Sequence, residues 1–230
     1  MALQFTNTSD VSVHYLKVLV HGPAGSGKTR LAGTTGAETL IISAEAGLLS
    51  LRNKKIDVFT VKDIAGVREV YEYLLTDKKY QWVVLDSISE IGEVVLNSEM
   101  EKTKDPRKAY GETANVLNAL IRCFRDLPKN VYVSAKQERT KDETTGQLFW
   151  GASMPGQKLG PALPYFFDEV FAMRTKNVTD ENGNIDTKYA LQTRRDDSYE
   201  AKDRSGVLAN FEEPDLSAIY DKIINQVQGE

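Results

Sequence analysis

The sequence has little of what disulfides and metal clusters require. Its 230 residues include one cysteine, Cys123, and two histidines, His14 and His21. A single cysteine excludes an intrachain disulfide and fits a reducing compartment, and so few thiols and imidazoles argue against a zinc site. Cys123 is interpreted as a small core residue, and His21 as a strand-end residue rather than a catalyst.

Long apolar runs are also missing. No stretch approaches the ~20 apolar residues that a membrane-spanning helix needs, and the first residues lack the basic start and apolar segment of a signal peptide. The net charge is −4, so any nucleic-acid site must be local. These absences predict a cytoplasmic protein with no membrane partner. We expect a polar N-terminal extension over 1–14 and one domain over 15–230.

The sequence does contain a phosphate-binding loop. The pattern G-x-x-x-x-G-K-[ST] is matched by Gly22, Pro23, Ala24, Gly25, Ser26, Gly27, Lys28 and Thr29. An apolar strand over 15–20 precedes the loop, and a helix from about Lys28 follows it. In this order the loop N–H groups and the helix N-terminus cradle phosphates, Lys28 reaches the β- and γ-phosphates, and the Thr29 hydroxyl binds Mg²⁺. A glycine-rich turn with a coincidental lysine is the alternative.

Strands and helices alternate along the rest of the chain. Further strands are predicted over 39–43, 57–60, 81–86 and 130–134, and helices over 64–75, 89–104, 116–127 and from Pro214 onward. The segments 169–174 and 188–193 read as an antiparallel pair, linked by a turn signal at 180–184. This alternation predicts an α/β fold: a mostly parallel central sheet with helices on both faces and an antiparallel edge.

Two acidic residues follow predicted strands. Asp86 ends an apolar strand, which is the Walker B pattern, and would hold Mg²⁺ through its water shell. The alternative is an N-cap for the next helix. Glu45 follows the strand 39–43 and would serve as a base, the alternatives being a solvated carboxylate or a helix cap. Because parallel strands end at one edge of a sheet, both carboxylates can face the crevice beside the phosphate loop.

Basic residues gather in two stretches. One is the cluster of Lys102, Lys104, Arg107 and Lys108, which separates two predicted helices. Lys104, Arg107 and Lys108 in this cluster are candidates for binding DNA. The other runs from Lys136 to about residue 160 and is predicted to be a long functional loop. It carries Lys136, Arg139, Lys141 and Lys158, with the adjacent aromatics Phe149 and Trp150. Cations and aromatics on a loop fit single-stranded DNA, whose phosphates and bases they would meet. Alternatively, Phe149 and Trp150 pack into the domain.

The order of these motifs resembles the RecA-type ATPase core over about residues 15–195. Residues 41–46 are similar to that family's second strand, in which the glutamate that activates the attacking water corresponds to Glu45. Residues 83–88 resemble its Walker B strand with an Asp-Ser pair, and 131–137 resemble the strand that opens its second DNA-binding loop, with Gln137 at the γ-phosphate-sensing position. The compact layout and the run 201–204 are similar to phage-encoded, RecA-like single-strand annealing ATPases.

This resemblance implies a RecA-like, Mg²⁺-dependent and DNA-stimulated ATPase, with Lys28, Glu45 and Gln137 in catalytic roles. It implies ATP as ligand, assembly on single-stranded DNA as a filament or ring, and annealing or strand pairing in recombination. A single-strand-binding protein is an expected partner, and a bacterial host carrying a phage an expected setting. Lys202 and Arg204 would reach a neighbouring subunit's phosphates, unless they form a solvated basic surface. The alternatives are a hexameric helicase-type core and a small-molecule P-loop kinase.

Overall fold

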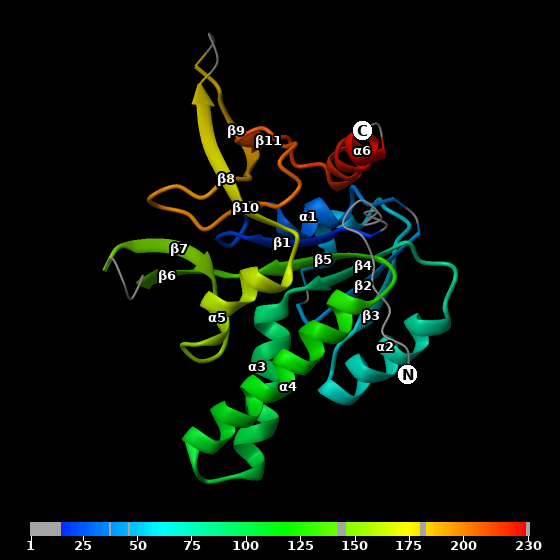
Figure 1. The fold of residues 1–230 in the computed structure, drawn as a ribbon, viewed down its shortest axis with the longest axis vertical. Helices are drawn as coiled ribbons and strands as arrows, with labels where there is room; N and C mark the ends of the chain where they lie inside the picture. The colour runs from blue at the N-terminus through cyan, green and yellow to red at the C-terminus, as the bar shows by residue number, and fades with distance from the viewer. Residues whose placement is uncertain (1–14, 37, 46, 142–145, 180–182, 229–230) are drawn as a thin grey trace, which may run out of the picture.

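A single large sheet forms the centre of the protein (Figure 1). The computed structural model describes residues 15–36, 38–45, 47–141, 146–179 and 183–228. The strands are β1 (Lys17–His21), β2 (Thr39–Ser43), β3 (Asp57–Thr60), β4 (Trp82–Asp86), β5 (Asn130–Ala135), β6 (Gln137–Lys141), β7 (Leu148–Ala152), β8 (Glu169–Thr179), β9 (Ile185–Gln192), β10 (Lys202–Asp203) and β11 (Phe211–Glu212). Their order in this sheet is β11-β9-β8-β1-β5-β4-β2-β3, with β10 beside β8 and the β6–β7 hairpin separate.

The strands β3, β2, β4, β5, β1 and β8 run parallel, and β9 is antiparallel to β8. This confirms the predicted mostly parallel sheet with an antiparallel edge. Every residue of β1, β2, β4 and β5 is buried, as expected for apolar strands covered on both faces. The bounds predicted for β2 and β3 are confirmed. The first strand, β1, begins two residues later than predicted, at Lys17, and ends one residue later, at His21.

Helices cover both faces of the sheet. They are α1 (Lys28–Ala32), η2 (Leu48–Leu51), α2 (Ile64–Thr76), α3 (Ile88–Lys102), α4 (Pro106–Asp126), α5 (Leu159–Ala162), η3 (Leu163–Phe166) and α6 (Leu216–Gln228). In Figure 1, α2, α3 and α4 lie on one face, with α1 and α6 on the other. Alternate strand residues serve the two faces: Leu19 and Leu85 join the core with α2, α3 and α4, whereas Val20 and Val84 join that of α1 and α6.

The capping residues explain where two helices begin. Asp63 is the N-cap of α2, because its carboxylate accepts a 2.8 Å hydrogen bond from the Gly66 N–H. The last helix begins after Pro214, at Leu216, because the Asp215 carboxylate accepts from the Ala218 N–H at 3.0 Å. The Leu216 N–H also donates to Thr34 Oγ1 at 2.9 Å, which fixes the start of α6 against the end of α1.

The predicted long loop after Lys136 is wrong in part, since the strands β6 and β7 pair there as an antiparallel hairpin. Residues 142–145 between them, including the acidic Asp142 and Glu143, lie outside the described residues. The hairpin docks through backbone groups on a segment distant in sequence: the Trp150 N–H donates to Ser198 O at 2.7 Å, and the Glu200 N–H donates to Trp150 O at 2.8 Å. Such docking needs few apolar side chains, which is why a polar sequence concealed the strands.

The antiparallel pair predicted for 169–174 and 188–193 is confirmed, because β8 and β9 pair in this way. Residues 180–182 of their turn lie outside the described residues, as does the whole extension 1–14. Among the described residues, no helix combines the length and apolar character that crossing a membrane requires.

One buried carboxyl group lies at the start of β8. Glu169 is 1% exposed, and its Oε1 accepts from the Ser205 N–H at 3.1 Å. Among the described residues, its Oε2 has no hydrogen-bond partner. Burial, together with the nearby Asp203 and Asp168 carboxylates, raises the pKa of Glu169 from 4.5 to about 8. The folded protein therefore keeps a proton on Glu169 that the unfolded chain releases near its ordinary pKa.

This raised pKa predicts a pH-dependent loss of stability. Because the folded state binds the extra proton, the stabilisation is complete below pH 4.5 and is lost as the pH rises through about 8. We expect Glu169→Gln to match the wild type near pH 4.5 and to exceed its free energy of unfolding at pH 8.5 by more than about 1 kcal/mol. Urea unfolding at both pH values measures this. Glu112→Gln, at an exposed glutamate, is the control. If Glu169→Gln and the wild type differed in unfolding free energy by the same amount at both pH values, the raised pKa of Glu169 would be contradicted.

Candidate functional site

The loop between β1 and α1 has the geometry that its sequence predicts. Gly25 and Gly27 have φ angles of +74° and +98°, which side-chain-bearing residues rarely adopt. Gly22 has no room for a side chain, since a Cβ there would lie 2.8 Å from Ser26 Oγ and 2.9 Å from Met173 Cβ. The loop therefore wraps tightly at the carboxyl end of β1, and its glycines are required by conformation and by space.

Lys28 points into the centre of this loop. Its Nζ donates to the carbonyl oxygens of Gly22 at 2.8 Å and Pro23 at 2.9 Å. Burial lowers the pKa of Lys28, while the Glu45 and Asp86 carboxylates act in the opposite direction. The ammonium group is thus held beside the loop backbone with both predicted acidic residues close enough to influence it.

Thr29 and Asp86, the two predicted metal ligands, are in direct contact. Thr29 Oγ1 donates to Asp86 Oδ2 at 2.7 Å, and the Ser134 hydroxyl donates to Asp86 Oδ1. Asp86 is 3% exposed at the end of β4. A hydroxyl and a carboxylate supply the oxygen ligands that Mg²⁺ prefers, usually with water in its remaining positions. The donor set at this point therefore fits Mg²⁺.

An unpaired hydroxyl in the loop fits a phosphate. Ser26 Oγ is buried and has no hydrogen-bond partner among the described residues. Buried polar atoms are nearly always paired, so a donor left unpaired inside a phosphate-binding motif matches an acceptor oxygen brought by the ligand. Together with Lys28 and the loop backbone, Ser26 completes a cradle for the phosphates of a nucleotide.

Glu45 lies at the same edge of the sheet, just beyond β2. Ser87 Oγ donates to Glu45 Oε1 at 2.6 Å, and the same Ser87 oxygen accepts from the Glu90 N–H at 3.3 Å as the N-cap of α3. The half-buried Glu45 carboxylate is therefore fixed in position near Lys28. A fixed, partly accessible carboxylate at this point can orient or deprotonate a water molecule that attacks a bound phosphate.

Gln137 also emerges at this edge, at the start of β6, but its side chain is turned toward His21. Burial lowers the pKa of His21, and the Gln137 amide acts on the ring in the opposite direction. His21 Nε2 lies 2.7 Å from Glu200 O and therefore donates to it. His21 Nδ1 and Gln137 Oε1 are buried without a hydrogen-bond partner among the described residues. The sensing role expected for Gln137 stays a prediction.

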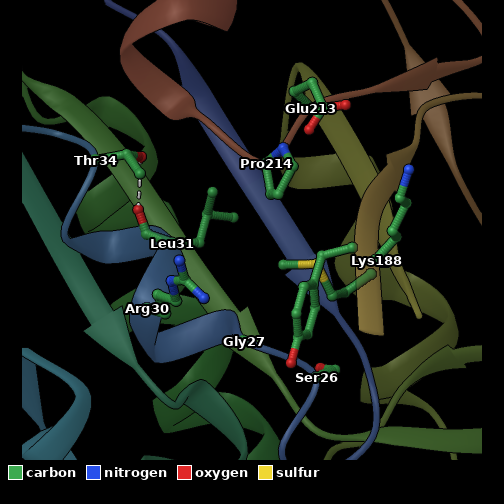
Figure 2. Close-up of a pocket in the computed structure, with 10 residues that line it drawn as sticks. Ser26, Gly27, Arg30, Leu31, Thr34, Lys188, Glu213 and Pro214 are labelled. Carbon is green, nitrogen blue, oxygen red and sulfur yellow. Dashed lines mark hydrogen bonds between the residues drawn. The ribbon is translucent and has the colours of Figure 1, made fainter. Parts of the chain in front are cut away.

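A pocket of about 460 Å³ opens beside the loop (Figure 2). Gly27 and Arg30 line it from the loop and α1, Lys188 and Tyr189 line it from β9, and Pro214 lines it from the segment before α6. The Tyr189 ring lies 3.6 Å from where a Gly27 Cβ would be. A pocket that combines apolar side chains such as Leu31 and Met173 with polar groups, next to a phosphate cradle, fits the base and ribose of a nucleotide.

The residues predicted to bind DNA lie in two separate places. Lys136, Arg139, Lys141, Phe149 and Trp150 lie on or next to the β6–β7 hairpin, where Lys136 pairs with Glu90. Phe149 and Trp150 are half-buried rather than exposed. The Arg195 guanidinium lies 4.8 Å from the Phe149 ring centroid, and that of Arg139 lies 5.7 Å from the Trp150 ring centroid.

The second place is the turn between α3 and α4. Lys104, Arg107 and Lys108 are exposed there, at the end of a helix pair that extends away from the sheet in Figure 1. The structure therefore does not bring this cluster to the phosphate loop. Its DNA-binding role stays a prediction.

Lys202 and Arg204 lie away from the phosphate loop of their own chain. Lys202 Nζ donates to Pro164 O at 2.7 Å and to Phe167 O, and an Arg204 N–H donates to Asp168 Oδ1 at 2.9 Å. Lys202 is the first residue of β10 and Arg204 directly follows that strand, which pairs with the first residues of β8. The phosphate loop instead follows the last residue of the parallel β1. Their proposed action on a neighbouring subunit stays a prediction.

Three positioning residues escaped the sequence analysis. Ser134 and Ser87 hold the two acidic side chains, and the buried Tyr132 donates from its hydroxyl to Lys28 O at 2.9 Å. Burial raises the pKa of Tyr132 well above its ordinary value. Ser134 and Ser87 stand at strand ends beside the predicted site, which was the available signal. Tyr132 is an aromatic inside an apolar strand, and nothing in that pattern distinguished it from core.

Comparison with known families identifies the class to which this site belongs. A family model described as an AAA domain matches residues 14–205, which is most of the chain. The chain therefore belongs to this family of AAA-type P-loop ATPases. No curated protein matches it. The predicted P-loop ATPase class is thus confirmed, whereas the RecA type of core and the narrower resemblance to phage annealing ATPases stay predictions.

Replacing Lys28 tests the phosphate cradle. We expect Lys28→Ala to abolish ATP hydrolysis and to weaken nucleotide binding by at least about 10-fold, because a charge-assisted contact to the terminal phosphates is lost. Hydrolysis assays and titration with a fluorescent ATP analogue measure the two effects. Lys55→Ala, at an exposed lysine away from the loop, is the control. Wild-type turnover in Lys28→Ala would show that the loop is not the site.

Replacing Glu45 separates catalysis from binding. Glutamine keeps the acceptor for the Ser87 hydroxyl but removes the negative charge, so Glu45→Gln should bind nucleotide and Mg²⁺ normally and turn over about 10²-fold more slowly. Single-turnover hydrolysis and nucleotide titration measure these two properties. An unchanged rate would remove Glu45 from the mechanism, and loss of folding would instead indicate a structural role.

Proposed function

We propose that the protein is a DNA-dependent ATPase, which binds ATP with Mg²⁺, assembles on single-stranded DNA as a filament or ring and promotes annealing or strand pairing in recombination. The AAA family supplies only the ATPase class. The DNA partner and recombination rest on the resemblance to phage RecA-like ATPases and on the features of the β6–β7 hairpin.

The site contains the parts that phosphoanhydride hydrolysis needs. Lys28, Ser26 and the loop backbone would hold the phosphates, and Thr29 with Asp86 would hold Mg²⁺, which neutralises charge on the transferred phosphate. Glu45 would orient the attacking water. Ser87 and Ser134 keep the two carboxylates in place through their hydroxyls, so the arrangement is pre-organised rather than assembled by the ligand.

The observation that carries the proposal is a continuous set of contacts between the hairpin and the phosphate loop. Trp150 O, on β7, accepts from the Glu200 N–H at 2.8 Å. Glu200 O accepts from His21 Nε2 at 2.7 Å. His21 is the last residue of β1 and directly precedes Gly22, whose carbonyl oxygen binds Lys28. A ligand that moves the hairpin would therefore change the loop that holds the phosphates.

The same region is poised to change. His21 Nδ1 and Gln137 Oε1 are buried and unpaired among the described residues, and such atoms each destabilise the state that contains them. Because His21 Nε2 donates to Glu200 O, both unpaired atoms are acceptors, and a rearrangement that brings a donor to either one would be favoured. Gln137 begins the hairpin and lies at the edge where the nucleotide phosphates would bind, so it is suited to report on either ligand.

The small-molecule kinase is the weaker alternative. Such a kinase needs a second substrate pocket and an arginine-rich lid over the phosphates. In the described part of 138–160, the arginine on the hairpin is Arg139, which is engaged with the Trp150 ring. Basic and aromatic residues on a two-stranded ribbon suit an extended polymer better than a small substrate.

The proposal is tested by ATP hydrolysis with and without oligo-dT, followed by size analysis of the protein in each state. We expect the single strand to stimulate hydrolysis and to produce larger assemblies in the presence of ATP. Duplex DNA of equal length is the control for non-specific phosphate contacts. Hydrolysis that oligo-dT leaves unchanged, in a protein that stays monomeric, would refute DNA dependence. Transfer of phosphate to a small acceptor would favour the kinase.

His21 gives a sharper prediction. His21→Phe keeps a ring in the buried position but removes the donor to Glu200 O, so the contact between hairpin and phosphate loop is broken. The ratio of DNA-stimulated to basal hydrolysis should fall about 5-fold, the equivalent of one lost hydrogen bond. Oligo-dT affinity, measured separately, should change less. A wild-type stimulation ratio would show that the contact does not couple the two sites.

A further inference from the structure

A groove of about 700 Å³ lies between the β6–β7 hairpin and the segment 157–165. Residues of β6 and β7 form one side, and α5 with the start of η3 forms the other. Gly160 makes the two sides meet, since a Cβ there would lie only 2.6 Å from Ala152 O. The groove is therefore shaped by close packing of the α5 backbone directly on β7.

The aromatic residue most open to solvent in this groove is Tyr165. Its exposed fraction is 83%, whereas Phe149, across the groove, is half-buried. Phe149 has one ring face beneath the Arg195 guanidinium, at 4.8 Å. An exposed tyrosine ring is open to a flat stacking partner, and only two χ angles are ordered when it stacks. Tyr165 is therefore a better stacking surface than the aromatics of the hairpin.

The charges in the groove favour a polyanion. Arg139, Lys141 and Arg195 are basic, and Glu138 and Glu200 are acidic. Glu200 Oε2 lies 3.7 Å from an Arg195 N–H group, so these two charges offset each other. Arg139 and Lys141 then remain against Glu138. The groove thus carries more positive than negative charge in a protein whose net charge is −4, and it is a local basic site of the kind that the composition requires.

We infer that this groove is the path of single-stranded DNA, with Tyr165 as its base-stacking residue and Arg139, Lys141 and Arg195 as its phosphate contacts. The inference rests on the proposed DNA dependence. It adds the segment 157–165, which forms the side of the groove opposite the hairpin. Phe149, which lines the groove, holds Arg195, and Trp150, which lies next to the groove, holds Arg139; neither ring is the stacking surface. Trp150 in turn contacts Glu200 through its backbone.

The first test measures the affinity of the full chain for fluorescent oligo-dT by anisotropy. Tyr165→Ala should weaken binding about 10-fold or more, as expected for loss of one base stack, whereas Tyr165→Phe, which keeps the ring, should bind like the wild type. An abasic strand of equal length separates stacking from charge, because Tyr165→Ala and the wild type should bind it equally. Tyr73→Ala, at another exposed tyrosine on α2, is the matched control.

The second test follows the phosphate contacts. Lys141→Ala should weaken binding to oligo-dT and to the abasic strand alike, and should reduce the slope of log affinity against log salt by about 0.7, the value for one phosphate contact on a single strand. Lys55→Ala, an exposed lysine far along the chain from the groove, should leave that slope unchanged.

The outcomes distinguish this inference from the proposed function. If the wild type binds oligo-dT and is stimulated by it, but Tyr165→Ala and Lys141→Ala both bind like the wild type, the groove is not the path and DNA dependence stands. Binding would then be sought at the α3–α4 turn. If Tyr165→Ala weakens binding to oligo-dT and to the abasic strand equally, the residue does not stack, and the inference fails. If the wild type does not bind oligo-dT with or without ATP, the proposed function fails as well.

Discussion

The nucleotide site depends on the position of one buried carboxylate. Asp86 accepts hydrogen bonds from Thr29, on the first helix after the phosphate loop, and from Ser134, on β5. It therefore connects β4, β5 and α1 at the edge where the parallel strands end. A charged group 3% exposed is tolerated because it is fully engaged by donors. These contacts set the spacing between the phosphate loop and the acidic residues, on which any chemistry at the site relies.

Much of this arrangement follows from the order of the sequence. An apolar strand that ends in Asp86, a second that leads to Glu45 and a glycine-rich loop after a third must converge if the strands are parallel. The structure brings Lys28, Thr29, Asp86 and Glu45 together as that argument requires. The central strands could also be predicted from the sequence, because strands buried on both faces are continuous apolar runs.

What escaped prediction depends on partners that are distant in the chain. The β6–β7 hairpin docks on Ser198 and Glu200 through its backbone, and no side-chain pattern records such a contact. Lys202 resembles a free cation in sequence, yet its ammonium binds the carbonyl oxygens of Pro164 and Phe167. The half-burial of Phe149 likewise results from Arg195, 46 positions further along. Sequence spacing predicts which residues reach an edge, but not which of them are already engaged.

The last helix packs on the domain although it lies beyond the range of the family match. The family match ends at residue 205, but Leu216, Ile219 and Ile223 of α6 belong to the core that covers α1. Pro214, just before that helix, lines the pocket beside the phosphate loop (Figure 2). A residue beyond the family match thus lines the pocket beside the phosphate loop. A change in the segment before α6 can therefore reshape this pocket without altering the phosphate loop itself.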